Sequence, residues 1–270
     1  MPRSSAPVVD AHCHVGSYCL AEDLLKMMDA AGVDRAVIFN HPWAWTLPRK
    51  DNYYNTNDYI ADMQAKYPER LTGFACINPR YTGDLELGIP NISVQELVRC
   101  VDELGLQGLK LHPENHCFPI DCLAGSEFMR TLSRLQKKKK RKIPILSHGM
   151  TTIGCMPDQF GTLAAAHPDV PIIIAHGAGF QNLYFPSYDP LKRHANLYAD
   201  TAMTTIDDAH LRGVARNVGV EKIVFGSDHF SRDHGNLYGN FFYVLERAFP
   251  DKKEREAILG GNLARIMRWK

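Results

Sequence analysis

The feature that most constrains this chain is a regular alternation of apolar, β-branched runs with segments of helical hydrophobic periodicity. Eight such runs follow one another, and their first residues lie roughly 30 residues apart, the length of one strand-and-helix unit. Several runs are almost continuously apolar, as parallel strands covered on both faces are. We predict strands at Val8–His12, Ala36–Phe39, Leu71–Ile77, Gly108–His112, Ile143–His148, Ile172–His176, Asn196–Asp200 and Lys222–Asp228.

The segments between these runs predict a ring of helices around the strands. Eight strand-and-helix units in succession are typical of a (β/α)8 barrel, and such barrels commonly have about this length as one domain. We therefore predict a single α/β domain over residues 1–270, a TIM barrel with a C-terminal helical extension over Lys252–Trp269. The predicted helices are Leu20–Ala31, Thr56–Tyr67, Val94–Leu104, Ser126–Lys139, Asp158–His167, Tyr188–His194, Asp207–Val218 and Tyr238–Phe249.

Composition favours a cytoplasmic protein that acts on a small molecule. The apolar fraction of 45% and the net charge of +1 are ordinary for a globular protein and give no reason to expect nucleic-acid or membrane partners. No apolar stretch is long enough to span a membrane, and residues 1–5 fit no signal peptide. The seven cysteines are an odd number, which favours reduced thiols. The basic run Lys137–Lys142 suits the solvated end of the fourth predicted helix better than a nucleic-acid patch.

Side chains of the kinds that bind metals follow several of the predicted strands. In a barrel of this type, the C-terminal ends of the strands carry the chemistry. Because His12 and His14 are two residues apart, a strand would present both imidazoles on one face and Cys13 on the other. A single histidine at a strand end is more often a hydrogen-bonded structural residue. Several ligand-type residues at the same end of several strands instead predict a metal site. The set is His12, His14, His41, Lys110, His112, His148, His176 and Asp228.

The motifs around these residues run along nearly the whole chain. They are Val9-Asp10-Ala11-His12-Cys13-His14, Gly108-Leu109-Lys110-Leu111-His112-Pro113, Ser147-His148-Gly149, Ala175-His176-Gly177, Phe225-Gly226-Ser227-Asp228 and Gly260-Gly261-Asn262-Leu263-Ala264-Arg265. In content and order they resemble the amidohydrolase superfamily, in the amidohydrolase-related branch that includes picolinate-pathway and resorcylate decarboxylases as well as hydrolases. The motifs are specific for the superfamily and not for a substrate.

The resemblance implies one divalent metal ion and assigns roles around it. Zinc is the first candidate for this ion, although nitrogen and oxygen ligands also bind Mn, Co or Fe. The implied catalytic residues are His176, as base or acid, and Asp228, which can accept a proton from an attacking water. Asp10 either orients a ligand from outside the coordination sphere or faces the helix layer. The implied metal ligands are His12, His14, His148 and Asp228.

Lys110 and His112 share one strand face, so both are candidate substrate contacts at the barrel mouth. Three interpretations of Lys110 remain open. Its ammonium can pair with a substrate carboxylate, it can be carboxylated and bridge two ions as in some relatives, or it can be a structural lysine within the barrel. The motif contexts favour a single ion over a pair.

Long loops after the even-numbered strands are rich in aromatic residues and would project over the same mouth. From these loops we select Trp43, Phe180 and Arg232 as candidate substrate-binding residues. They favour a pocket for an aromatic or apolar body that carries a polar group. An interface between two copies of the chain, a homodimer through the catalytic-face loops, explains the same aromatics equally well.

Four functions are compatible with these residues. The first is a metal-dependent hydrolase, in which a metal-bound water attacks an ester, lactone, amide or related carbon of a small carboxylate- or aromatic-containing molecule. The alternative is a metal-dependent, non-oxidative decarboxylase of an aromatic or unsaturated carboxylic acid, with Asp228 or His176 delivering the proton. Schiff-base chemistry at Lys110 and an inactive, metal-loaded scaffold come after these.

Overall fold

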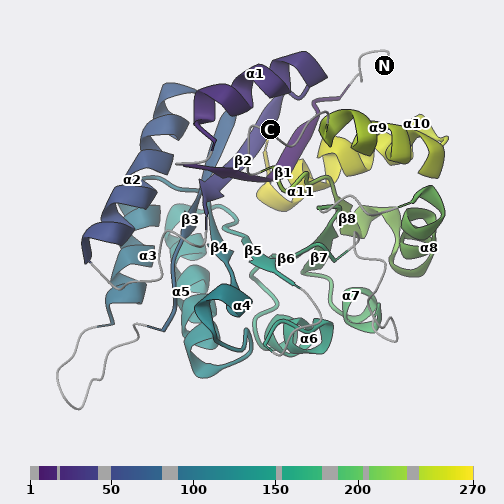
Figure 1. The fold of residues 1–270 in the computed structure, drawn as a ribbon. Helices are drawn as coiled ribbons and strands as arrows, with labels where there is room; N and C mark the ends of the chain where they lie inside the picture. The colour runs from purple at the N-terminus through teal and green to yellow at the C-terminus, as the bar shows by residue number, and fades with distance from the viewer. Residues whose placement is uncertain are drawn as a thin grey trace.

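Eight parallel strands form one sheet in sequence order, and helices surround the sheet (Figure 1). The structure is a computed structural model that describes residues 6–16, 19–41, 50–80, 91–149, 154–177, 188–202, 207–229 and 237–269. The predicted (β/α)8 barrel is confirmed. The strands are β1 (Val9–Val15), β2 (Arg35–Asn40), β3 (Leu71–Cys76), β4 (Gly108–Leu111), β5 (Ile145–His148), β6 (Ile172–Ala175), β7 (Leu197–Asp200) and β8 (Ile223–Val224).

The helices follow the predicted order, with one addition. The added helix is α4, a single turn that starts at a proline directly after β4 and is capped by the side chain of His112. Sequence periodicity cannot detect a helix of four residues. The helices are α1 (Ala21–Ala31), α2 (Lys50–Lys66), α3 (Ile92–Asp102), α4 (Pro113–His116), α5 (Leu123–Lys139), α6 (Pro157–Ala166), α7 (Asp189–Arg193), α8 (Asp208–Val218), α9 (Leu237–Ala248), α10 (Lys252–Glu256) and α11 (Asn262–Met267).

A register shift in β1 decides which of its side chains face the barrel interior. Pairing with β2 is irregular between Asp10 and Cys13. Before the shift, Val9 packs in the interior cluster, whereas after it Cys13 packs in the outer cluster beneath the helices. Strict alternation would place Asp10 and His12 on the same face, so the shift lets His12 face inward while Asp10 faces the helix layer.

The first and last strands meet along a short seam instead of a full ladder. β1 and the segment that follows β8 share one isolated parallel bridge, between Cys13 and His229. Two backbone hydrogen bonds accompany it: the Ala11 amide donates to the Phe225 carbonyl at 2.8 Å, and the His14 amide donates to the His229 carbonyl at 2.7 Å. The seam is therefore the least extensively paired strand boundary of the barrel.

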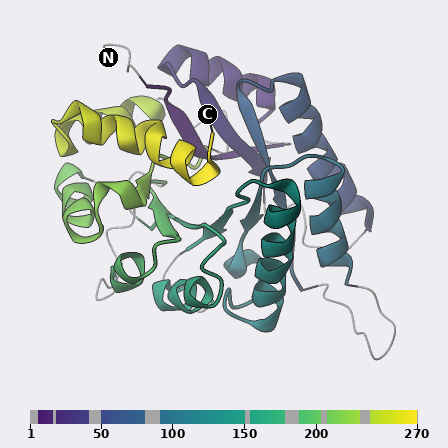
Figure 2. The same ribbon diagram turned by 180° about the vertical axis from the view of Figure 1, so that it is seen from behind.

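The C-terminal extension closes the barrel at the N-terminal ends of the strands. Leu263, Ile266 and Met267 of α11 pack in the same cluster as the inward-facing residues of the strands. Viewed from behind, the yellow C-terminal helices lie across this end of the barrel (Figure 2). Chemistry is consequently confined to the opposite end, where the strands finish.

The basic run Lys137–Lys142 spans the end of α5, as predicted. Lys138 and Lys139 form ion pairs with Asp102, and Arg141 donates to the Leu106 carbonyl at 2.8 Å. These cations join the end of α5 to the end of α3 and to the connection that leads into β4. Among the described residues, no helix is both long and apolar enough to cross a membrane.

Candidate metal centre

β1 presents two imidazoles to the barrel mouth. The Nε2 atoms of His12 and His14 lie 3.3 Å apart, and both side chains are buried. His14 Nδ1 is 3.2 Å from the Asn40 carbonyl oxygen, so it donates there and leaves Nε2 as an acceptor. Burial lowers the pKa of His14 to about 3, which keeps this ring neutral near pH 7. Both imidazoles thus lie on one face of β1, as predicted.

Asp228 reaches the same point from the end of the β8 segment. Its Oδ1 lies 3.1 Å from His12 Nε2 and 3.3 Å from His14 Nε2. Although burial alone would raise the pKa of Asp228, the neighbouring histidines hold it well below its usual range, so the carboxylate is ionised. The residue has a positive φ of 57°, a left-handed conformation that non-glycine residues rarely adopt.

His176 completes a group of atoms suited to a cation. Ligand atoms of His12, His176 and Asp228 all lie within 4.8 Å of one another. His176 Nδ1 is buried and has no hydrogen-bond partner in the described part of the chain. Burial lowers the pKa of His176 to about 4, so the ring is neutral and offers a lone pair. Neutral imidazole nitrogens beside an ionised carboxylate fit a divalent ion such as zinc.

His148 lies beside this group, and its two ring nitrogens have different partners. Its Nδ1 is 3.1 Å from His176 Nε2, and its Nε2 is 3.1 Å from Glu114 Oε2. Its ring also stacks on His112, with centroids 3.9 Å apart. The geometry therefore places His148 against His176, with Nε2 directed at Glu114 on α4 instead of at His12. Its role as a metal ligand stays a prediction.

Lys110 sits below the imidazoles and has no exposed surface. Its Nζ is 3.1 Å from His12 Nε2 and 4.7 Å from the centre of the Phe39 ring. Burial lowers its pKa to about 8, while Asp228 and Asp200 act in the opposite direction. In this arrangement the ammonium contacts His12 and is shielded from solvent. The three interpretations of Lys110 stay predictions.

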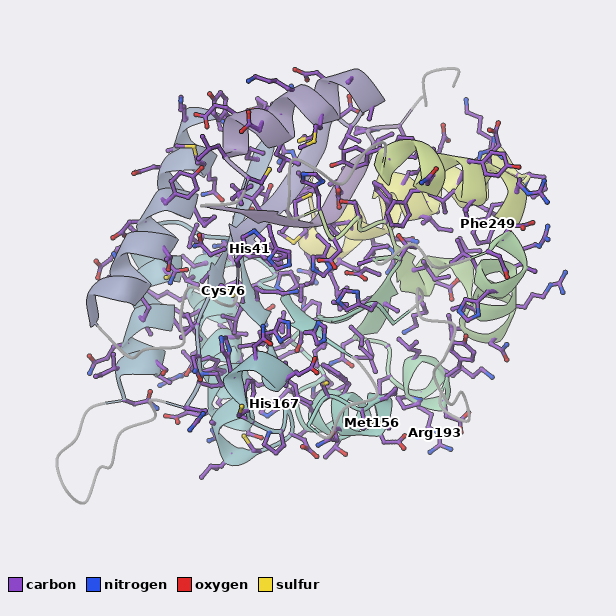
Figure 3. All side chains as sticks on the ribbon, in the orientation of Figure 1. His41, Cys76, Met156, His167, Arg193 and Phe249 are labelled. Carbon is purple, nitrogen blue, oxygen red and sulfur yellow. The ribbon has the colours of Figure 1, made fainter. Side chains whose placement is uncertain are left out.

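Asp200 is central to the site and was missed by the sequence reasoning. It ends β7, is fully buried, and accepts a hydrogen bond from His12 Nδ1 at 2.8 Å. The rule that selected the ends of the other strands would have selected Asp200 had it been applied to the seventh. Glu114 was also missed, and no sequence signal marks it. His41, near the middle of Figure 3, stacks on His14 with centroids 4.9 Å apart.

The remaining predicted residues are placed as follows. Asp10 faces the helix layer and accepts hydrogen bonds from the Ser227 amide at 2.9 Å and the Tyr238 hydroxyl at 2.9 Å. It therefore ties β1 to the segment before Asp228. The candidate substrate contacts Trp43, Phe180 and Arg232 lie outside the described residues.

A family model described as amidohydrolase matches residues 9–269. A gamma-resorcylate decarboxylase from Rhodococcus jostii (strain RHA1) is 33% identical over 89 residues, 31% of this chain. The matched segment spans 25% of that relative's length, so the likeness is local.

Solved structures match over nearly the full chain. A 2,6-dihydroxybenzoate decarboxylase from Rhizobium has a TM-score of 0.68 and 18% identity, covering 97% of this chain and 99% of that one. A dihydroxybenzoic acid decarboxylase from Polaromonas sp. JS666, solved with manganese and the inhibitor 2-nitroresorcinol, has a TM-score of 0.69 and 16% identity, covering 97% of each chain. At these identities the likeness establishes a shared fold.

Proposed function

The chain belongs to the amidohydrolase family, and from that premise we propose that it is a divalent-metal-dependent, non-oxidative decarboxylase of an aromatic carboxylic acid. The observation that carries the proposal is the convergence of His12, His176 and Asp228, with His14 alongside. The same convergence would serve a hydrolase, the first of our sequence-based interpretations. We now place decarboxylation first because the similar proteins reported above are decarboxylases.

The proposed substrate is a planar benzoate with a hydroxyl group next to its carboxylate. A bound divalent ion would act as a Lewis acid on the oxygens of such a chelating pair. The bond between the ring carbon and the carboxylate breaks, carbon dioxide leaves, and the electron pair left on the ring carbon takes up one proton. His176 or Asp228 delivers that proton, since both border the converging ligand atoms.

Substrate would approach from the side of the site that remains open. The side chains of Asp228 and His148 are 15% and 11% exposed, whereas Lys110 and His12 are closed off. Glu114 stands beside His148 with 42% exposure. The exposed edge of the site thus runs from the end of β8 to α4, and an aromatic ring entering there would meet the stacked imidazoles of His112 and His148.

We propose zinc as the first candidate ion, with manganese next. The ligand atoms are imidazole nitrogens and a carboxylate oxygen, which zinc favours but which Mn, Co and Fe also accept. Elemental analysis of protein purified without added metal, followed by reloading of chelator-treated protein with each ion, identifies which one supports turnover.

The test of function is release of carbon dioxide from metal-loaded protein. A panel of ortho-hydroxybenzoates, including 2,6-dihydroxybenzoate, is incubated beside a panel of esters, lactones and amides. We expect carbon dioxide and the corresponding phenol from the first panel, loss of turnover with chelator, and recovery when the ion returns. Hydrolysis of the second panel without carbon dioxide from the first would replace the proposal with a hydrolase. Undiminished turnover by metal-free protein would exclude both.

A further inference from the structure

Asp200 contacts two members of the metal-binding group from a third strand. Its Oδ2 accepts from His12 Nδ1 at 2.8 Å. Its Oδ1 accepts from the backbone amides of His176 at 2.6 Å and Ala202 at 3.0 Å. The carboxylate is fully buried and all of these partners are donors, so it is held as an ionised acceptor. One side chain on β7 thereby links β1 to the end of β6.

The hydrogen bond to Asp200 determines which nitrogen of His12 carries the proton. In neutral imidazole one nitrogen is a donor and the other an acceptor. Because Nδ1 donates to Asp200, Nε2 keeps its lone pair. Lys110 points to the same tautomer independently: its ammonium has only donors, and it lies 3.1 Å from Nε2. Nε2 is also the nitrogen that lies 3.1 Å from Asp228 Oδ1, where the ligand atoms converge.

The second contact of Asp200 supports an unusual backbone. His176 has a positive φ of 65°, which costs a non-glycine residue about 1–2 kcal/mol. The His176 amide donates to Asp200 at the shortest distance in this network. The same carboxylate thus secures the conformation that turns the His176 ring toward Asp228.

The end of β8 leaves room for the pair formed by Asp200 and His12. A Cβ atom at Gly226 would lie 2.9 Å from the His12 Cβ and 3.2 Å from Asp200 Oδ2. Gly226 is held there by two hydrogen bonds with the Thr201 hydroxyl, each 3.1 Å long. Only glycine fits this position without displacing the carboxylate or the imidazole.

We propose that Asp200 is the positioning residue of the metal centre: it fixes the tautomer of His12 that exposes Nε2 and the backbone of His176, and so sets how tightly the site holds its ion. The inference rests on the metal site of the proposed function but not on decarboxylation. Carboxylate partners of metal-binding histidines commonly change metal affinity by about 10- to 100-fold.

The direct test is Asp200→Asn, read by spectroscopy of the metal-free protein and by metal titration. An asparagine that keeps its oxygen on the His176 amide presents an NH2 group to His12, which favours a proton on Nε2. We expect ¹⁵N spectra of histidine-labelled protein, recorded above the raised pKa of His12 and with His12 assigned through His12→Gln, to show Nε2 unprotonated in wild type and protonated in D200N. We expect Co²⁺ affinity to fall about 10- to 100-fold and the Co²⁺ visible spectrum to change.

The matched control is Glu96→Gln, another buried carboxylate changed to an amide. Glu96 accepts from Asn57 at 2.9 Å and pairs with Arg99 in the helix layer, away from the site. E96Q should change thermal stability without altering Co²⁺ affinity. Asp200→Glu keeps the charge and the acceptor, so its Co²⁺ affinity should lie closer to wild type than that of D200N. Asp200→Ser removes the carboxylate with a smaller side chain and replaces D200N if D200N does not fold.

The possible results separate the two proposals. Wild-type Co²⁺ affinity and an unchanged His12 tautomer in folded D200N would overturn the role of Asp200. If D200N fails to fold, wild-type Co²⁺ affinity in folded D200S would do the same. Absence of Co²⁺ or Zn²⁺ binding by wild-type protein would instead defeat the proposed function, and the metal part of this inference with it. Binding of metal without decarboxylation would leave the inference standing.

Discussion

At the residue scale, the site combines an ionised carboxylate with imidazoles that burial keeps neutral. Asp228 has a pKa well below its usual range because of the histidines around it, although burial opposes the shift. His14 and His176 have lowered pKa values because they are buried. An ionised carboxylate beside two neutral imidazoles suits a cation site, since Asp228, His14 and His176 each offer a lone pair.

Asp228→Asn should abolish most turnover. The amide keeps the shape of the side chain but loses the negative charge that faces His12 and His14 and the ability to pass on a proton. We expect carbon dioxide release to slow by about 10²–10⁴-fold, measured as kcat on protein whose metal content is assayed in parallel. Asp207→Asn is the control, because asparagine also caps a helix and Asp207 caps α8 at the surface. A fully loaded D228N protein with wild-type kcat would refute the assignment.

The metal-free protein should lose stability as pH falls from about 6.5. His14 and His176 have folded-state pKa values of about 3 and about 4, below the value of about 6.5 expected in the unfolded chain. Between these values the unfolded state binds more protons, so the free energy of unfolding falls with pH. His12, with a raised pKa, opposes the trend.

Urea denaturation of chelated protein at pH 7.5 and pH 5 measures this dependence. We expect a lower midpoint at pH 5 and a smaller difference between the two pH values in His176→Gln. Equal midpoints in wild type would mean that the two imidazoles are not held neutral by burial.

At the element scale, the seam between β1 and β8 is where the site connects distant parts of the chain. His12 and His14 stand on one side of it and Asp228 on the other. Since the backbones on the two sides share one bridge and two hydrogen bonds in the described part of the chain, an ion bound by both sides should reinforce the boundary.

Hydrogen exchange with and without Zn²⁺ tests this reinforcement. The Ala11 and His14 amides cross the seam, so we expect their exchange to slow when metal is added. The Leu109 amide, which donates to the Pro144 carbonyl between β4 and β5, is the control and should change less. Equal changes at all three amides would indicate global stabilisation only.

The strands were predictable because their apolar runs are distinct, whereas local irregularities were not. Apolar periodicity located all eight strands, and their polar final residues pointed to the site. The register shift between Asp10 and Cys13 has no signature in apolar patterning, so the sequence left two orientations of Asp10 open. The left-handed backbones of His176 and Asp228 were equally invisible, because no glycine occupies those positions. Asp200 and Glu114 contact residues that are far away in the sequence, and local apolar patterning does not predict such contacts.

At the scale of the whole molecule, large apolar side chains are exposed around the rim of the catalytic face. Among the described residues, Leu20, Ile92, Leu123 and Met156 are exposed, and each stands at the first turn of a helix. Helices of a (β/α)8 barrel begin at the end where the strands finish. Exposed apolar groups on one face favour an interface between copies, which is one of the two interpretations of the loop aromatics, and we propose a homodimer through this face.

Light scattering of the eluting protein tests the dimer, with Leu123→Glu as the variant. Leu123 is 78% exposed, so a charge there costs the monomer little. We expect a dimer in wild type and a shift toward monomer in L123E. The control is Tyr243→Glu, because Tyr243 is 62% exposed in α9 and not at a helix start. A monomeric wild type would end the dimer proposal.

The position of the seam also bears on biosynthesis. Residues 12 and 14 are synthesised with the first strand, whereas residue 228 is synthesised only after all eight strands. A nascent chain therefore cannot offer the complete set of proposed ligands until translation has passed the last strand. Stable acquisition of the proposed ion must consequently be a late event in the maturation of this protein.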